Sequence, residues 1–267
     1  MYVWDIEERS TMKIIYFVGT AGSGKSTLVS TYRSWLLERG IDVAVLNLDP
    51  GADTLPYEAD VDIREWVSMN EVMDEYALGP NGAQVVAADL MALNVKKLVE
   101  AVDGMRSTFL LVDTPGQLEL FAFRESSNVI MEALGKERSM TAYLLDPMLC
   151  RSPNGFISSL VLSSLVQFRL GVPMINILTK TDTVDRDTVE RMVLWHSDEY
   201  ALYSDLSDES ADPSTVVGQE LYKAVEGLGM FGDVLAASSE TGEGMEGIYA
   251  AAGQTFFGGD DPDTDSD

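Results

Sequence analysis

The chain has 267 residues, of which 46% are hydrophobic, and its 44 acidic and 18 basic residues give a formal net charge of −26. This length predicts one α/β domain with insertions, and the negative charge argues against direct binding of nucleic acid. A single cysteine excludes an internal disulfide. Because the chain lacks both an apolar run of membrane-spanning length and a secretory signal, we expect a cytoplasmic protein with no membrane association.

The acidic residues are scattered along the whole chain, and the chain has 7 lysines against 11 arginines. One interpretation is a halophile's surface, kept soluble by charges of the same sign. The other is an acidic surface that recruits a basic partner. The scattered distribution of the acidic residues favours the halophilic interpretation.

The first predicted strand, residues 13–18, leads into a glycine-rich loop and then a helix over 27–39. Residues 1–11 have no clear period and are interpreted as an N-terminal extension, with translation starting at Met1 or Met12. The loop reads glycine, four residues, then Gly-Lys-Ser, a pattern typical of phosphate binding. In it, Lys25 would face the β- and γ-phosphates, and the Ser26 hydroxyl would bind Mg²⁺. The residues expected to contact the nucleotide here are Gly22, Ser23, Gly24, Lys25, Ser26 and Thr27.

The second predicted strand, 41–48, ends in Asp49-Pro50-Gly51. Open α/β sheets place ligands at the carboxyl ends of their strands. Asp49 is therefore a candidate for Mg²⁺, directly or through water, and for orienting a water. An ordinary Asp-Pro-Gly turn is the alternative interpretation.

A long segment, about 54–106, separates the second and third strands and is predicted to be a helical insertion. Its patterns predict short helices over 62–70 and 71–78 and a longer one over 87–102. Between them, residues 78–82 read Leu-Gly-Pro-Asn-Gly, which predicts a tight exposed loop.

The third predicted strand, 108–112, ends in Asp113-Thr-Pro-Gly116-Gln117. Paired with the phosphate loop, Asp113 would hold Mg²⁺ through water, and the Gly116 N–H would sense the γ-phosphate. The Gln117 amide could orient an attacking water, or it could be an ordinary polar residue at a helix start. Glu119 follows two residues later and is a further candidate.

A helix over 118–134, a strand over 141–145 and a helix over 154–170 precede the fifth predicted strand, 173–178. That strand runs into Thr179-Lys180-Thr181-Asp182. The Asp182 carboxylate could accept hydrogen bonds from guanine N1–H and N2–H₂, a donor pair that adenine lacks, while the Lys180 stem would pack over the base. Asn is usual at the position of Thr179.

The rest of the chain predicts a helix over 185–202, a solvated acidic loop over 203–214, and a helix over 215–226. A sixth strand over 233–237 leads to Ser238 and Ser239, whose turn could bring backbone N–H groups to guanine O6. A closing helix over 243–257 precedes residues 258–267, an acidic segment predicted to be disordered.

The order of these motifs, with Gly79-Pro80-Asn81 in the insertion, resembles the GPN-loop GTPases over about residues 12–257. The resemblance implies a P-loop NTPase fold, three-layer α/β/α with a mainly parallel sheet, in which the helical insertion carries the GPN loop. It also implies a homodimer that hydrolyses GTP to GDP with Mg²⁺. Asn81 would reach the γ-phosphate region of the partner's site, and Gln117 and Asp49 would handle the attacking water. With the composition, the chain looks like a haloarchaeal member.

The same resemblance implies a possible client protein, such as RNA polymerase subunits, because eukaryotic relatives act in polymerase assembly. Two other functions stay open: a nucleotide-dependent scaffold or chaperone with little hydrolysis, and a dimeric P-loop ATPase. Such ATPases usually carry an extra lysine early in the loop, where this chain has Thr20-Ala21, and Asp182 argues against adenine. Turnover of GTP and ATP measured side by side would separate the three.

Overall fold

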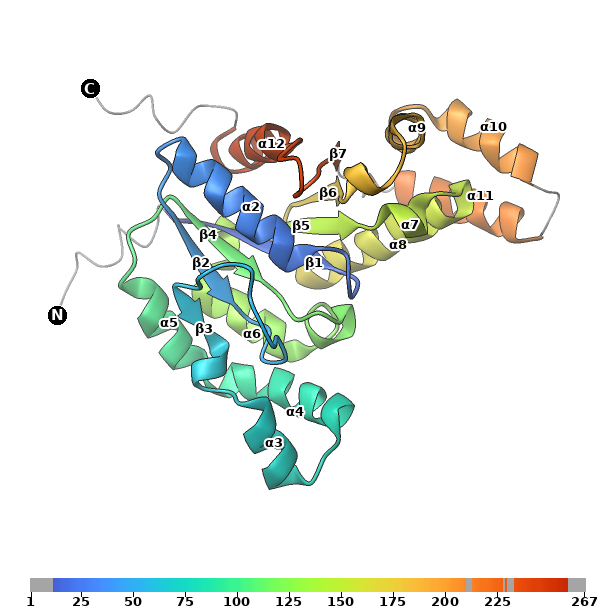
Figure 1. The fold of residues 1–267 in the computed structure, drawn as a ribbon. Helices are drawn as coiled ribbons and strands as arrows, with labels where there is room; N and C mark the ends of the chain where they lie inside the picture. The colour runs from blue at the N-terminus through green and yellow to red at the C-terminus, as the bar shows by residue number, and fades with distance from the viewer. Residues whose placement is uncertain (1–11, 210–212, 228, 230–232, 259–267) are drawn as a thin grey trace.

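The computed structural model describes residues 12–209, 213–227, 229 and 233–258. In this part of the chain, one parallel sheet of seven strands runs in the order β3-β2-β4-β1-β5-β6-β7 (Figure 1). The strands are β1 (Lys13–Gly19), β2 (Val43–Asn47), β3 (Val61–Asp62), β4 (Phe109–Asp113), β5 (Ser139–Leu145), β6 (Met174–Leu178) and β7 (Val234–Ala236).

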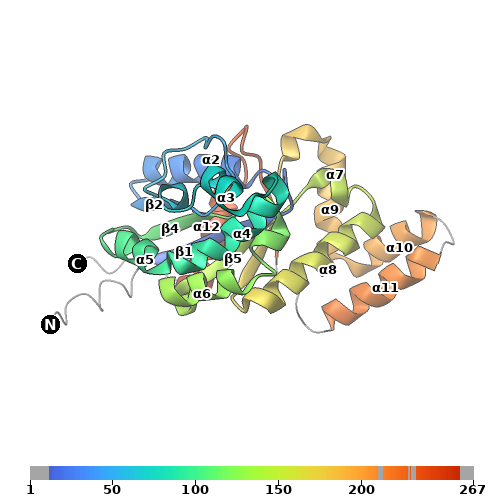
Figure 2. The ribbon, with the colours of Figure 1, turned by 90° about the horizontal axis from the view of Figure 1, so that it is seen from below.

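Helices cover both faces of the sheet, which gives the predicted three layers (Figures 1 and 2). The longer helices are α2 (Lys25–Glu38), α3 (Met69–Tyr76), α4 (Pro80–Leu93), α5 (Val95–Asp103), α6 (Glu125–Leu134), α8 (Pro153–Leu170), α9 (Arg186–Ser197), α10 (Glu199–Glu209), α11 (Pro213–Glu226) and α12 (Met245–Phe257). The short ones are α7 (Pro147–Cys150) and the 3-10 helices η1 (Ile63–Glu65), η2 (Leu118–Leu120), η3 (Lys136–Arg138) and η4 (Thr181–Thr183).

The two faces of β1 show how the core is divided. Ile15 and Phe17 pack into one cluster with residues of α2 and α12. Ile14, Tyr16 and Val18 point the other way, into a larger cluster with residues of α4, α6 and α8. Because successive side chains of a strand alternate between faces, an apolar residue at every position buries both sides of a parallel sheet.

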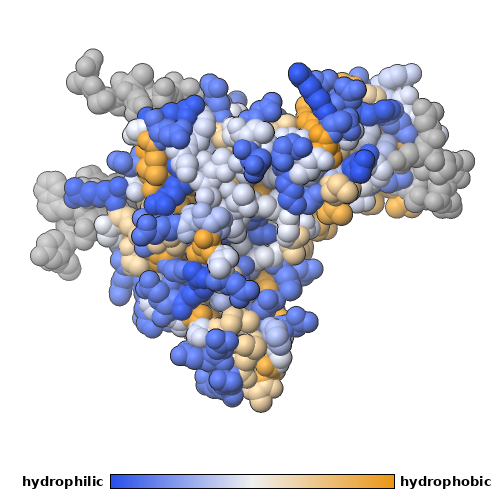
Figure 3. All heavy atoms as spheres, viewed as in Figure 1, coloured by the Kyte–Doolittle hydropathy of each residue, from blue (hydrophilic) through white to orange (hydrophobic). Residues whose placement is uncertain are grey.

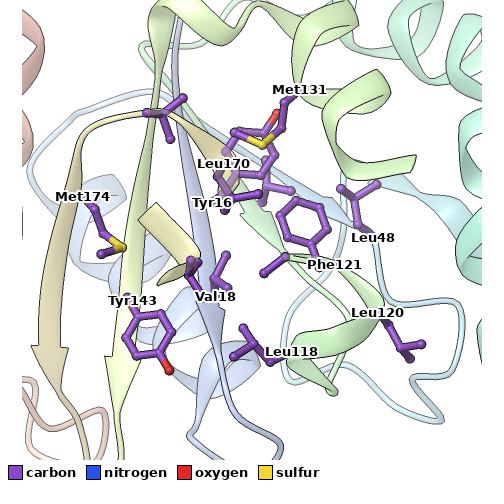
Figure 4. Close-up of a cluster of buried hydrophobic side chains, with 14 of the residues drawn as sticks. Tyr16, Val18, Leu48, Leu118, Leu120, Phe121, Met131, Tyr143, Leu170 and Met174 are labelled. Carbon is purple, nitrogen blue, oxygen red and sulfur yellow. The ribbon is translucent and has the colours of Figure 1, made fainter. Parts of the chain in front are cut away.

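The larger cluster also anchors the segment that follows β4 (Figure 4). Phe121 stacks on Tyr16 with their ring centroids 5.8 Å apart. Leu118 and Leu120 of η2 are buried in the same cluster. These contacts fix the position of the backbone just after Gln117, at the edge of the sheet.

Several predicted elements in the insertion were wrong in detail. Residues 78–82 are not a free loop, because Gly79 caps α4 and Pro80 is its first helical residue. Proline suits that position, since its missing N–H would have no partner there. The predicted helix 87–102 is two helices, α4 and α5, separated at Asn94.

The prediction of a helix over 62–70 missed β3, whose Val61 pairs with Leu46 of the neighbouring strand. Two residues are too few to show a strand period in the sequence. The predicted helix 118–134 is η2 followed by α6, and α10 covers most of the predicted loop 203–214. Residues 1–11 and 259–267 lie outside the described residues, as do 210–212 of that loop.

In the view of Figure 3, hydrophilic residues cover most of the surface, and apolar residues gather at the lower end, over α3 and α4. Among the described residues, no helix is long and apolar enough to cross a membrane.

Candidate functional site

The predicted site residues meet at the carboxyl edge of the sheet. The loops after β1, β2, β4 and β6 all start there, because the strands are parallel and end on the same side (Figure 1). The loop after β1 and the first turn of α2 hold Gly22, Ser23, Gly24, Lys25, Ser26 and Thr27.

The glycines of the phosphate loop are required by its geometry. A Cβ on Gly19 would lie 2.7 Å from Ser23 Oγ and 2.9 Å from the Leu144 carbonyl oxygen. Gly24 caps α2 with φ of +93°, a left-handed conformation that favours glycine. The chain can therefore turn tightly from β1 into the helix N-terminus, where N–H groups point at an anion.

Lys25 joins the phosphate loop to the segment after β4. Its Nζ donates to the carbonyl oxygens of Gly19 (3.0 Å), Thr20 (3.0 Å) and Gly116 (3.1 Å). Burial lowers the pKa of the Lys25 ammonium, and the nearby Asp113 and Asp49 carboxylates raise it. The ammonium is thus held at the point where the first and third motifs meet.

Asp113 lies at the end of β4 and is 1% exposed. Its Oδ2 accepts a hydrogen bond of 2.7 Å from the Tyr57 hydroxyl. Burial raises the pKa of the Asp113 carboxyl, while the Ser26 hydroxyl, the Tyr57 hydroxyl and the Lys25 ammonium lower it. Its other oxygen, Oδ1, is buried without a hydrogen-bond partner in the described part of the chain.

The orphaned Asp113 oxygen fits a divalent cation, because Mg²⁺ prefers hard oxygen ligands, and the Ser26 hydroxyl interacts with the same carboxylate. The described residues contain no group of three or more His, Cys, Asp or Glu side chains placed to hold a metal ion. Protein ligands alone would leave the coordination shell of Mg²⁺ incomplete here. Phosphate oxygens and waters would have to fill it, as at other nucleotide sites.

Asp49 ties the loop after β2 to the loop after β4. Its Oδ1 accepts from the Gly51 N–H and its Oδ2 from the Gly116 N–H, both at 2.9 Å. Burial raises the pKa of the Asp49 carboxyl, while these two N–H groups, Lys25 and Arg64 lower it. The Gly116 N–H, predicted to sense the γ-phosphate, is engaged by Asp49 in this arrangement.

Gln117 follows Gly116 and is exposed, with its Nε2 donating to Gln84 Oε1 at 2.9 Å. Glu119, in η2, and Asn81, in the first turn of α4, are also exposed. Neither of these two side chains hydrogen-bonds another described residue. A hydrogen bond therefore joins Gln117 to α4, whereas none joins Glu119 or Asn81 to another predicted site residue in the described part of the chain.

The predicted base-reading residues are bonded directly to the phosphate loop. The Thr179 hydroxyl contacts the carbonyl oxygens of Ser23 (2.9 Å) and Leu145 (3.1 Å). This buried hydroxyl joins β5 to the phosphate loop, which gives a physical reason for Thr at the position where Asn is usual. Lys180 has φ of +52° and donates to the Gly22 carbonyl oxygen (2.5 Å) and to Asp146 Oδ2 (2.8 Å).

Asp182, in η4, is held by the turn after β7. Its Oδ1 accepts from the buried Ser238 hydroxyl at 2.5 Å. The neighbouring Ser239 carbonyl oxygen accepts from the Thr31 hydroxyl of α2 at 3.0 Å. The segments after β6 and β7 therefore meet, with the Asp182 carboxylate beside the serine turn.

Sequence reasoning missed several side chains that contact these residues, among them Tyr57, Gln84 and Asp146. Asp146 directly follows β5, and the strand-end rule used for Asp49 and Asp113 would have found it. Tyr57 and Gln84 belong to the long insertion, where no local pattern indicates which side chains return to the sheet edge.

A family model described as "Conserved hypothetical ATP binding protein" matches residues 17–256. A GPN-loop GTPase of Pyrococcus abyssi is 37% identical over 180 residues, which are 67% of this chain and 71% of the relative. GPN-loop GTPase 1 of Dictyostelium discoideum is 28% identical over 252 residues, or 90% of this chain. The alignment spans 60% of the Dictyostelium protein's own length.

A solved structure from Pyrococcus abyssi, described as a GTPase in apo form, superposes with a TM-score of 0.81 and 33% identity. It covers 93% of this chain and 98% of the solved chain. The parallel sheet, the phosphate loop and the strand-end carboxylates define a protein of the P-loop GTPase class. Within that class, the chain belongs to the GPN-loop GTPase family.

Proposed function

We propose that this chain binds GTP together with Mg²⁺ and hydrolyses it to GDP and phosphate. The observation that carries the proposal is the bonding of the base-reading segment to the phosphate loop. Thr179 and Lys180 both donate to carbonyl oxygens of that loop, at Ser23 and Gly22. One nucleotide can therefore meet Asp182 and Lys25 at the same time.

The choice of guanine rests on Asp182. Its carboxylate can accept from both guanine N1–H and N2–H₂, whereas adenine presents no such donor pair. The family model's description mentions ATP, so the base is the first point to test. Phosphate release from GTP and from ATP should be measured in parallel, with nucleotide competition for the same site. Hydrolysis of GTP with little hydrolysis of ATP supports the proposal, and equal hydrolysis of both nucleotides would contradict it.

Mg²⁺ would be held near Ser26 and Asp113, where it would supply positive charge to the β- and γ-phosphate oxygens. The chain's own residues do the rest. Lys25 neutralises phosphate charge, and Gln117 orients the attacking water through its side-chain amide. Asp49 holds the Gly116 N–H, and so fixes the backbone from which Gln117 projects.

We further propose that two copies associate and that Asn81 of each contributes to hydrolysis in the other. Asn81 is exposed on the first turn of α4, one turn before the exposed apolar Val85, and Tyr76 of the neighbouring α3 is exposed as well. An uncharged amide can donate to a phosphate oxygen, and a two-fold dimer would complete two sites at once. The contact of Gln84 with Gln117 favours the alternative to this proposal, in which Asn81 acts at the site of its own chain.

A client-binding scaffold with little hydrolysis is the second candidate function, with RNA polymerase subunits as the proposed clients. The two functions share the nucleotide site and differ in turnover. We also infer a halophilic archaeal source, because acidic residues are spread over the whole chain. Separately, we propose a cytoplasmic location.

A further inference from the structure

Gln84 lies between two of the segments that form the site. It belongs to the second turn of α4 and is half-buried. Its Oε1 accepts the 2.9 Å hydrogen bond from Gln117 Nε2. Its Nε2 lies beside Gly51, 3.4 Å from where a Cβ on that glycine would be. Gly51 in turn donates to Asp49, so one side chain reaches from the loop after β4 to the loop after β2.

The direction of the Gln84 amide decides which atoms Gln117 presents to solvent. The Gln84 NH₂ group is on the side of the carboxylate-bearing Asp49 turn, which leaves its carbonyl oxygen toward Gln117. A glutamine amide has two N–H donors and one carbonyl acceptor. With one N–H given to Gln84, Gln117 keeps Oε1 to accept from a water and a second N–H to donate to a phosphate oxygen.

A second contact holds α4 against the same segment. Arg124, a few residues after η2, forms a two-pronged pair with Asp89 of α4, through Nε at 2.9 Å and Nη2 at 2.7 Å. Paired hydrogen bonds of this kind fix orientation as well as distance. Helix α4 is therefore joined to the segment after β4 at two residues, Gln84 and Asp89, which are about one and a half turns apart.

We infer that Gln84 is a positioning residue for hydrolysis: it selects the amide orientation in which Gln117 can orient the attacking water. The inference rests on the proposed GTPase function and on the role of Gln117 in it. An exposed glutamine without such a partner would spend much of its time in other rotamers, or with its amide turned over. Gln84 itself touches neither the water nor the phosphates in this account.

The experiment measures the affinity for GTP and GDP and the rate of GTP hydrolysis in four full-length proteins. These are wild type, Gln84→Met, Gln117→Leu and the double variant. Gln84→Met keeps the length and packing of the side chain without its polar atoms. Loss of one neutral hydrogen bond should lower kcat about three- to tenfold. The Kd values for GTP and GDP and the melting temperature should stay at the wild-type values, which a merely structural role would not predict.

In the Gln117→Leu background, Gln84→Met should cause no further loss, because residues that act through one another are not additive. Gln254→Met, the same substitution at an exposed position of α12, is the matched control and should behave as wild type. A wild-type kcat in Gln84→Met would overturn the inference, and so would an equal further loss in the double variant. Two other results would show that the underlying proposal itself is wrong: wild-type protein that does not hydrolyse GTP, or Gln117→Leu protein that hydrolyses it at the normal rate. Either result overturns the inference about Gln84 as well.

Discussion

The part of the site proposed to hold the nucleotide and the part proposed to act on the water are fixed by different kinds of contact. Lys25 and Thr179 donate to backbone carbonyl oxygens and are buried. Gln117 is exposed, and its contact with Gln84 is between two side chains. Backbone atoms at strand ends are placed by the sheet, whereas an exposed side chain loses conformational entropy when it is ordered.

The two kinds of contact predict which substitutions should change nucleotide affinity and which should change turnover. Changes among the backbone-bonded residues should alter nucleotide affinity. Changes around α4 and Gln117 should alter turnover and leave affinity near normal.

Lys25→Ala should abolish tight nucleotide binding, with a loss of at least about a hundredfold in GTP affinity, because charge-assisted contacts to phosphate are lost. Fluorescent GDP and GTP analogues would measure it. Lys97→Ala, on the exposed surface of α5, is the control for a lost positive charge. Micromolar binding retained in Lys25→Ala would mean that the nucleotide site lies elsewhere.

Asp182→Asn should weaken GTP binding by about 2–4 kcal/mol, because buried guanine donors would lose their acceptor. Competition by GTP and ATP against a labelled nucleotide would measure the change. Asp187→Asn, an exposed acid on α9, controls for charge alone. If wild-type protein already binds ATP and GTP equally well, the role assigned to Asp182 is wrong.

Gln117→Leu should lower kcat about tenfold or more while the Kd for GTP stays near normal, as when only a transition-state contact is lost. Single-turnover phosphate release, with Kd measured separately, distinguishes the two effects. An unchanged kcat would remove Gln117 from the mechanism and leave Asp49 or Glu119 as the residue that acts on the water.

Tyr57→Phe should have the smallest effect, a loss of about 1–2 kcal/mol in the free energy of unfolding without nucleotide, because the buried Asp113 Oδ2 would lose its donor. Denaturant titration measures it. Tyr200→Phe, at an exposed position of α10, is the matched control. Equal stability of the two variants would show that the Tyr57 hydroxyl contributes nothing to holding Asp113.

The two regions also differ in how far the sequence predicted them. The strand-end motifs were found because a buried strand followed by Gly-Lys-Ser, Asp113 or Asp182 is a local pattern, and a parallel sheet brings all strand ends to one edge. The sequence could not predict the contacts of Tyr57 and Gln84. Each joins segments dozens of residues apart, and no local period encodes where such side chains meet.

The prediction of an exposed loop at residues 78–82 was wrong for another reason. Proline, asparagine and glycine favour both tight turns and the first turn of a helix, so local chemistry left two outcomes. In the structure these residues begin helix α4, which places Gln84 one turn after Asn81. Thr179 was recognised as a departure from the usual asparagine, yet the contacts of its hydroxyl with two carbonyl oxygens depend on the packing of β5 against the phosphate loop.

Mixing two inactive variants tests whether one chain holds the nucleotide while Asn81 of another chain assists hydrolysis. Asn81→Ala should stay folded and dimeric and bind GDP, but lose most GTP turnover, and Lys25→Ala should bind no nucleotide. With free subunit exchange and independent sites, the heterodimer has one site with both residues intact, so mixing should restore up to about half of one dimer's activity. No recovery, despite heterodimers demonstrated by mass, would contradict the claim and assign Asn81 to its own chain or to no role in hydrolysis.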